Sequence, residues 1–159
     1  MDTPINEYHI EKSRVPVALT LLGGARMSGQ LFILATGRHA SVLEDAPGFM
    51  NSVDPFFPLR RDDGSTVIIS KDHVLTVDFP PEYASDWRFG DLARIEVVMQ
   101  GGQVHEGEIA LEHHIGHARV LDHMNRVQEP FLLLQRDGAV TLLNRTHIAY
   151  VHPLDDAAT

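Results

Sequence analysis

Cysteine is absent from the 159 residues of this chain. Without thiols the protein has no disulfide framework, no thiolate metal site and no cysteine nucleophile, so a reducing, cytoplasmic setting is expected. No apolar run approaches the roughly 18–20 residues of a membrane span, which predicts no membrane partner. The first fourteen residues are polar and lack the apolar stretch that defines a signal peptide.

Positive charge is also scarce, because 13 Lys and Arg face 22 Asp and Glu and the formal net charge is −9. A negative protein repels phosphate backbones at long range, so nucleic acid is not an expected partner.

Catalytic motifs are missing as well. The sequence contains no Gly-x-Ser-x-Gly elbow, no phosphate-binding loop and no dinucleotide fingerprint. The acidic positions Glu44, Asp122, Asp62 and Asp137 are predicted to be turn and strand-end residues rather than a catalytic carboxylate set. We therefore predict that the protein is not an enzyme.

What the chain does contain is an internal repeat, because residues 17–77 align with residues 95–151. The matched positions are turn glycines, apolar residues and one basic corner, as in Gly29 with Gly107 and Lys71-x-His73 with Arg145-x-His147. Repetition of this length indicates two similar structural units. The predicted organisation is an arm at 1–14, a first unit at 15–80, a linker at 81–92, a second unit at 93–154 and a tail at 155–159.

Short segments of alternating apolar residues, such as Val15, Val17, Leu19 and Leu21, predict half-buried strands. The connections are too short for crossover helices, which excludes a parallel sheet. The fold class predicted is all-β, with two tandem, strongly bent five-stranded small barrels and helical turns at most in the arm and linker. The predicted strands cover residues 15–21, 27–34, 40–44, 56–60, 66–69 and 74–79, then 93–100, 104–112, 118–122, 130–136, 139–144 and 147–151.

Both copies resemble the two sequence motifs of the Sm-like family, and Src-homology-3-like barrels share part of the pattern. The first motif is Val17-x-Leu19-x-x-Leu22-x-Gly24-x-x-x-x-Gly29-x-Leu31 followed by Val42-Leu43-Glu44-Asp45-Ala46, and the second is Val67-Ile68-Ile69-Ser70-Lys71-Asp72-His73-Val74-x-x-Val77. The resemblance implies a bent five-stranded barrel that joins edge to edge into rings and usually binds RNA. Two fused units would make a ring of half as many chains, for instance a trimer.

The residues with which this family grips RNA are replaced in both copies. The family's asparagine falls at Ala40 and Ala118, and its Arg-Gly pair falls at Ser70-Lys71 and Asn144-Arg145. The resemblance therefore implies the fold and the ring tendency without the RNA site. A rival hypothesis is RNA binding through another surface, formed by Lys71, Arg145, Arg119, Arg126 and Arg136.

Histidine is unusually frequent, with ten residues in the chain. In the barrel prediction His39 lies near His73, and His117 lies near His147, so these four residues, with Lys71 and Arg145, are the candidate ligand-binding positions. His113, His117 and His147 form a candidate triad for a divalent transition metal, since converging neutral imidazoles bind zinc, nickel or copper. The favoured alternative is that the corner histidines hydrogen-bond backbone carbonyls, with no cofactor.

The sequence thus predicts a non-catalytic binding or scaffolding protein that associates with itself through barrel edges, and another protein is a further candidate partner. RNA binding and histidine-ligated metal binding stay open as alternatives.

Overall fold

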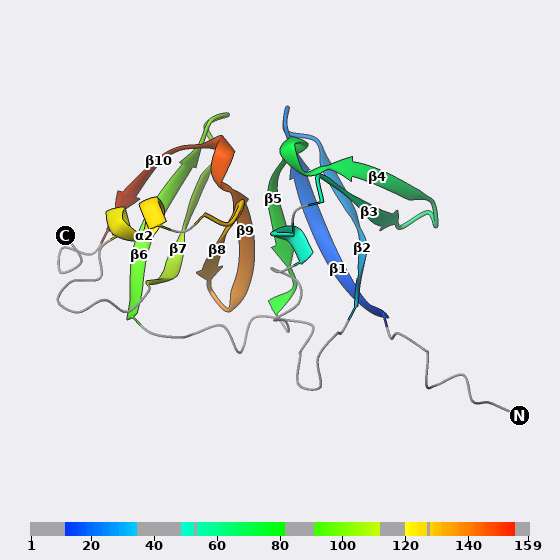
Figure 1. Cartoon of the computed structure of the whole chain (residues 1–159), viewed down its shortest axis with the longest axis horizontal. Coiled ribbons are helices and arrows are strands. Elements are labelled where there is room, and N and C mark those ends of the chain that lie inside the picture. The colour runs from blue at the N-terminus through cyan, green and yellow to red at the C-terminus, as the bar shows by residue number, and fades with distance from the viewer. Residues whose placement is uncertain are drawn as a thin grey trace, which may run out of the picture.

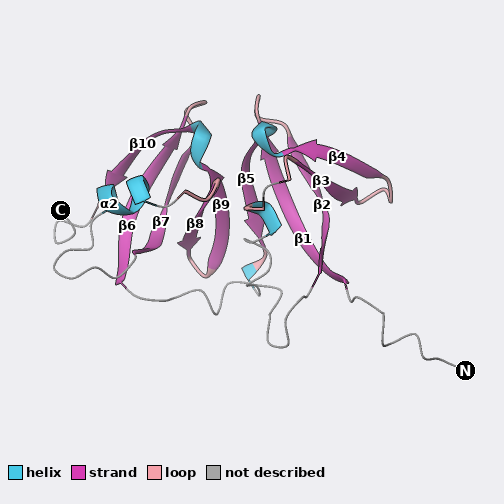
Figure 2. Cartoon of the chain, viewed as in Figure 1, coloured by secondary structure: helices cyan, strands magenta, loops and turns pink. Residues whose placement is uncertain are grey.

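The computed structural model describes residues 12–34, 49–52, 54–81, 91–111, 120–126 and 128–154, whose ten strands form one antiparallel sheet (Figure 1). The predicted all-β fold class is confirmed (Figure 2). The predicted strand at 40–44 lies outside these residues, and the first strand begins at Lys12, inside the predicted arm. The strands are β1 (Lys12–Leu21), β2 (Arg26–Leu34), β3 (Phe56–Arg61), β4 (Thr66–Ser70), β5 (Val74–Phe79), β6 (Asp91–Met99), β7 (Val104–Leu111), β8 (Phe131–Arg136), β9 (Ala139–Asn144) and β10 (Ile148–Pro153).

The strand order in the sheet is β10-β6-β7-β8-β9-β5-β1-β2-β3-β4. We call β1–β5 the first half and β6–β10 the second half. In each half the last strand lies beside the first strand of that half, and β5 of the first half also pairs with β9 of the second. The sheet is therefore continuous and open, which corrects the expectation of two separately closed barrels. Because β9 occupies the remaining edge of β5, β4 stays at the end of the sheet.

The period-2 prediction for the first strand is confirmed, because Val15, Val17 and Leu19 are buried while Arg14 and Pro16 are exposed. Side chains of this kind form two apolar cores, one in each half.

The two apolar cores exchange residues across the boundary between the halves. Phe131, Val140 and Leu142 of the second half pack into the core of the first half, whereas Leu75 packs into the core of the second. The halves are therefore joined by buried apolar contacts as well as by backbone pairing.

Gly29 and Gly107 mark the places where two strands cross too closely for a side chain. A Cβ atom at Gly29 would lie 2.4 Å from the carbonyl oxygen of Arg60, and one at Gly107 would lie 2.4 Å from that of Gln135. The glycine pattern in the sequence therefore has the same physical cause in both halves, a close approach of β2 to β3 and of β7 to β8.

The prediction of a strand at residues 118–122 is wrong for residues 120–122, which begin the helix α2 (Val120–Arg126). This helix also corrects the expectation that helical turns occur only in the arm and linker. Val120 is buried, Met124 packs against the same core and Leu121 is 69% exposed, so the inward spacing is the helical i, i+4. Among the described residues, no helix is long and apolar enough to cross a membrane.

Candidate functional site

Two 3-10 turns, η2 (Lys71–His73) and η4 (Arg145–His147), follow β4 and β9 and lie at the same end of the molecule (Figure 1). Because β5 pairs with β9, the two turns are in direct contact. The Asn144 side-chain amide donates to the carbonyl oxygens of Lys71 at 3.2 Å and Val74 at 2.9 Å. The His147 Nε2 lies 2.6 Å from the carbonyl oxygen of Asp72 and donates to it, since a carbonyl can only accept. We call η2 the first corner and η4 the second corner. The side chains of the second corner therefore hold the first corner in place through these hydrogen bonds.

The Lys71 side chain is only 7% exposed and points into its own half. Its ammonium donates to the carbonyl oxygens of Phe49 at 3.4 Å and Ser52 at 3.1 Å, and to the Ser52 hydroxyl at 2.9 Å. Burial lowers the pKa of Lys71, and the negative charge of Asp54 opposes that shift. Lys71 thus fastens the helical turn at Phe49 and Met50 beneath the corner.

Arg145 likewise donates hydrogen bonds to backbone carbonyls in the second half. Its guanidinium donates to the carbonyl oxygen of Glu129 at 3.2 Å and to that of Met124 near the end of α2. The two basic residues proposed as ligand-binding groups are therefore both engaged with backbone carbonyls, and a phosphate would have to compete with those bonds.

The predicted histidine positions are only partly within the described residues. The ring of His147 is half-buried on the carbonyl of Asp72, and His73 is exposed at the corresponding corner. His39, His113 and His117 lie outside the described residues, so the structure does not place the predicted metal triad. Within the ranges that are described, no group of three His, Asp or Glu residues could hold a metal ion.

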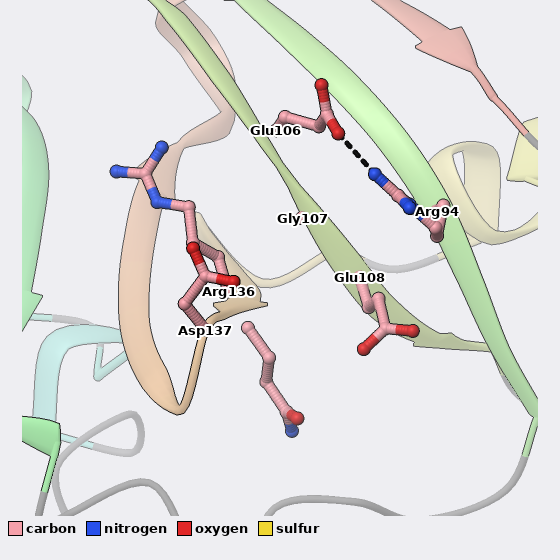
Figure 3. Close-up of a pocket in the computed structure, with 7 residues that line it drawn as sticks. Arg94, Glu106, Gly107, Glu108, Arg136 and Asp137 are labelled. Atoms are coloured by element: carbon pink, nitrogen blue, oxygen red, sulfur yellow. Dashed lines mark hydrogen bonds and ion pairs between the residues drawn. The ribbon is translucent and has the colours of Figure 1, made fainter.

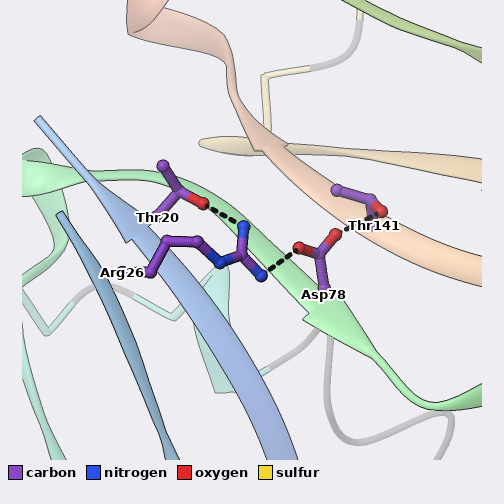
Figure 4. Close-up of polar contacts among 4 residues, drawn as sticks. All are labelled: Thr20, Arg26, Asp78 and Thr141. Carbon is purple, nitrogen blue, oxygen red and sulfur yellow. Dashed lines mark hydrogen bonds and ion pairs between the residues drawn. The ribbon is translucent and has the colours of Figure 1, made fainter. Parts of the chain in front are cut away.

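Below the corners, a carboxylate links the two halves through side chains (Figure 4). The Thr141 hydroxyl donates to Oδ1 of Asp78 at 2.7 Å, and the Arg26 guanidinium lies 3.4 Å from Oδ2 of the same carboxylate. Arg26 also donates to the Thr20 hydroxyl at 2.9 Å. Asp78 therefore joins β9 of the second half to β1 and β2 of the first.

A second link comes from the helical turn of the first half. The backbone N–H of Phe131 donates to Oδ1 of Asn51 at 2.8 Å. We call this set of contacts, with the β5·β9 pairing and the clamp at the corners, the internal junction.

The two ends of the sheet contrast with this junction. β4 and β10 lie on opposite sides of the molecule, and each pairs on one side only within the described sheet (Figure 1). Large apolar side chains are exposed there, with Ile68 of β4 at 75%, Phe56 of the adjacent β3 at 56% and Tyr150 of β10 at 59%. Edge strands with exposed apolar residues are ready to pair with another chain.

A polar groove of about 460 Å³ lies in the second half, beside the close approach of β7 and β8 at Gly107 (Figure 3). An ion pair between Arg94 and Glu106 lies on its rim. Residues of β6, β7, β8 and the following turn line the groove: Arg94, Glu106, Gly107, Glu108, Gln135, Arg136 and Asp137.

The first half has a hollow of about 360 Å³ beside Gly29, the residue aligned with Gly107, but its walls include Pro16, Val17, Phe79 and Pro80. The two places thus differ in chemistry, because the hollow of the first half is largely apolar, although Ser28, Asp62 and Asp78 also line it.

His105 is a half-buried residue on β7. Burial lowers the pKa of His105, the charge of Arg136 lowers it further, and Asp78 opposes both.

Among the side chains that hold the internal junction, His147 was a predicted site residue, whereas Asn51, Asp78, Thr141 and Asn144 were not. Asn51 could have been noticed, because Met50-Asn51 is repeated as Met124-Asn125 in the second half. Asn144 had no such signal, since the position aligned with it is Ser70.

With this geometry in hand, comparison with known proteins adds no relative: no protein-family model, curated protein or solved structure matches the chain.

Proposed function

We propose that this protein is a non-catalytic scaffold or binding module that associates with itself through the two edges of its sheet. The observation that carries the proposal is the state of the end strands. β4 and β10 have one partner each in the described sheet, and Ile68 and Tyr150 on them are largely exposed. A second chain would satisfy the backbone groups and cover the apolar residues.

The proposal includes the finer reading of the fold, in which each half is a strongly bent, Sm-like five-stranded unit. Two observations support it. The strand order β5-β1-β2-β3-β4 of the first half has its counterpart β10-β6-β7-β8-β9 in the second. Gly29 and Gly107 permit the same close strand crossing in each half.

The position of the basic residues disfavours the rival proposal of RNA binding. Lys71 and Arg145 already donate to backbone carbonyls, and a net charge of −9 opposes phosphate approach. A scaffold therefore accounts for more of the described features than an RNA-binding surface does.

The test is the mass of the full chain in solution. We expect light scattering at micromolar concentrations to give a multiple of the 17.7 kDa chain mass. Ile68→Lys should lower that mass, because a charge at an edge blocks strand pairing. The matched control is Val104→Lys, which places the same charge at a position 54% exposed on β7, two strands in from the β10 edge.

A strictly monomeric wild-type chain would overturn the proposal. An assembly that tolerates Ile68→Lys as well as it tolerates Val104→Lys would show that association does not use the β4 edge.

A further inference from the structure

The polar groove beside Gly107 lies at a place where the two halves differ in chemistry. Its volume of about 460 Å³ is within the range of sites that hold small molecules. The first half forms the same close strand crossing at Gly29. Three charged residues of the groove nevertheless align with uncharged residues of the first half: Arg94 with Pro16, Glu106 with Ser28 and Glu108 with Gln30. The fold therefore does not require these charges, which leaves them available for a role in binding.

The strands on the β7 side of the groove crowd negative charges together. Glu96 of β6 lies directly opposite Glu106 of β7, and Arg94 lies directly opposite Glu108. Arg94 forms an ion pair with Glu106, and the ring of His152, 3.8 Å from Glu96, carries charge only when it is protonated. Like charges that face each other on paired strands are destabilising, so this part of the sheet holds an excess of negative charge. A bound cation would relieve it.

The end of β8 and the turn that follows bring charges of both signs to the other side of the groove. Arg136 ends β8 and Asp137 begins the turn, whereas Glu106 and Glu108 project from β7 (Figure 3). Toward other residues in the described part of the chain, the side chains of Glu108, Arg136 and Asp137 make no ion pair or hydrogen bond. Two carboxylates and one guanidinium are thus left to contact a ligand.

We propose that this groove binds a small molecule of the basic amino acid class, such as lysine or arginine. The two cationic groups of the ligand face Glu108 and Asp137, and its carboxylate faces Arg136. Two carboxylates and one guanidinium match two cations and one carboxylate, so every charge has a partner of opposite sign. The overall net charge of −9 also attracts a positively charged ligand at long range. This inference does not depend on the self-association proposed above.

The exposure of the groove sets the strength of binding. Glu108 is half-buried, whereas Arg136 and Asp137 are exposed. Ion pairs at exposed positions are screened by water and salt, so we expect a dissociation constant in the millimolar range that rises with ionic strength.

A titration of the full chain with L-lysine, followed by saturation-transfer difference NMR of the ligand signals, tests the proposal. This measurement detects weak binding whether the chain is monomeric or assembled. Norleucine lacks the side-chain ammonium, and cadaverine lacks the carboxylate. Each should bind at least about threefold more weakly than lysine, because each loses one of the three charged contacts.

Two variants place the ligand in the groove. Glu108→Gln installs the residue found at the aligned position of the first half and should weaken lysine binding about fivefold. Asp137→Asn should weaken it about threefold, and asparagine tolerates the positive φ of 49° at this residue. The matched control is Asp62→Asn, which removes the aligned carboxylate of the first half and should leave the affinity for lysine unchanged.

Equal affinities for lysine and norleucine, or no saturable binding in the millimolar range, would overturn the proposal. An equal loss of affinity in Asp62→Asn and Asp137→Asn would also overturn it, because lysine would then be attracted by the net charge alone. If Glu108→Gln does not fold, the three ligands measured on the wild type still decide. Light scattering measures self-association separately, so its outcome and this one are independent.

Discussion

The internal junction and the two ends of the sheet have similar apolar chemistry but opposite exposure. Leu142 is fully buried, whereas Ile68 at the aligned position is 75% exposed. The local sequence does not predict different burial for these two residues, because both lie in strands rich in apolar residues. The difference arises because the strand that covers Leu142 belongs to the same chain. A buried apolar residue in one half therefore identifies which exposed residue in the other half lacks a cover.

The largest expected difference comes from truncating these two side chains. Leu142→Ala should lower the free energy of unfolding by about 2–5 kcal/mol, because it opens a cavity in the first core. Ile68→Ala should cost less than about 0.5 kcal/mol in the isolated chain, since it removes an exposed side chain. Urea unfolding at a concentration where the chain is monomeric measures both.

A similar loss of unfolding free energy in the two variants would contradict the difference between the junction and the sheet ends, because it would mean that Ile68 is already covered within a single chain. Measuring the same two variants at high protein concentration adds a second test of this difference. There, Ile68→Ala should weaken the assembly, because the residue is then part of an interface.

The next effect comes from the asparagine at the clamp. Asn144→Ala should lower the free energy of unfolding by about 1–3 kcal/mol, because it removes the side-chain donor that bonds the carbonyl groups of both Lys71 and Val74. Ser70 makes no capping bond with its side chain, and Ser70→Ala should therefore be nearly silent in the same measurement.

The reciprocal substitution places asparagine at the position aligned with Asn144. Ser70→Asn introduces the same side-chain donor in the first half, where no strand of the described sheet lies beyond β4 to accept from it. The free energy of unfolding should therefore change by less than about 0.5 kcal/mol. Urea unfolding measures the change, and a gain of about 1 kcal/mol or more would contradict the difference between the junction and the sheet ends.

The smallest effect is a pH dependence at the first corner. Burial is the main cause that lowers the pKa of Lys71 below its ordinary value of 10.5. Between the folded value and 10.5 the unfolded chain binds more protons, so the free energy of unfolding contributed by this group rises with pH in that window. Below the folded value the cost of burying the charge is constant.

Urea unfolding from neutral pH to about pH 10 should therefore show wild type gaining stability relative to Lys71→Met. Arg145→Met is the matched control, because a guanidinium does not titrate in this range and its removal should leave the slope unchanged. A wild-type slope equal to that of Lys71→Met would mean that the ammonium of Lys71 is not held in a desolvated site.

The strands were predictable from the sequence because their cause is local. The alternation of Val15, Val17 and Leu19 reports one buried face directly. The two crossing glycines were visible as interruptions of strands, although the carbonyl that each one approaches was not.

The order of the strands was not predictable, because β5 and β9 are far apart in sequence. Each already has one partner in its own half, and the sequence does not indicate which strand pairs with its second edge. The same distance hid the roles of Asn51 and Asn144, whose partners come from the other half. The helix α2 was missed because seven residues hold only one i, i+4 apolar pair, Val120 with Met124. Lys71 was identified as a candidate for ligand binding from its charge, but its neighbours in space are backbone carbonyls.

The most direct test of the account is the mass of the chain in solution, measured by light scattering for the wild type and for Ile68→Lys. The account predicts a wild-type mass that is a multiple of 17.7 kDa, and a lower mass for Ile68→Lys than for Val104→Lys. A monomeric wild type, or an equal mass for the two variants, would contradict the proposal that the exposed ends of the sheet bind another chain.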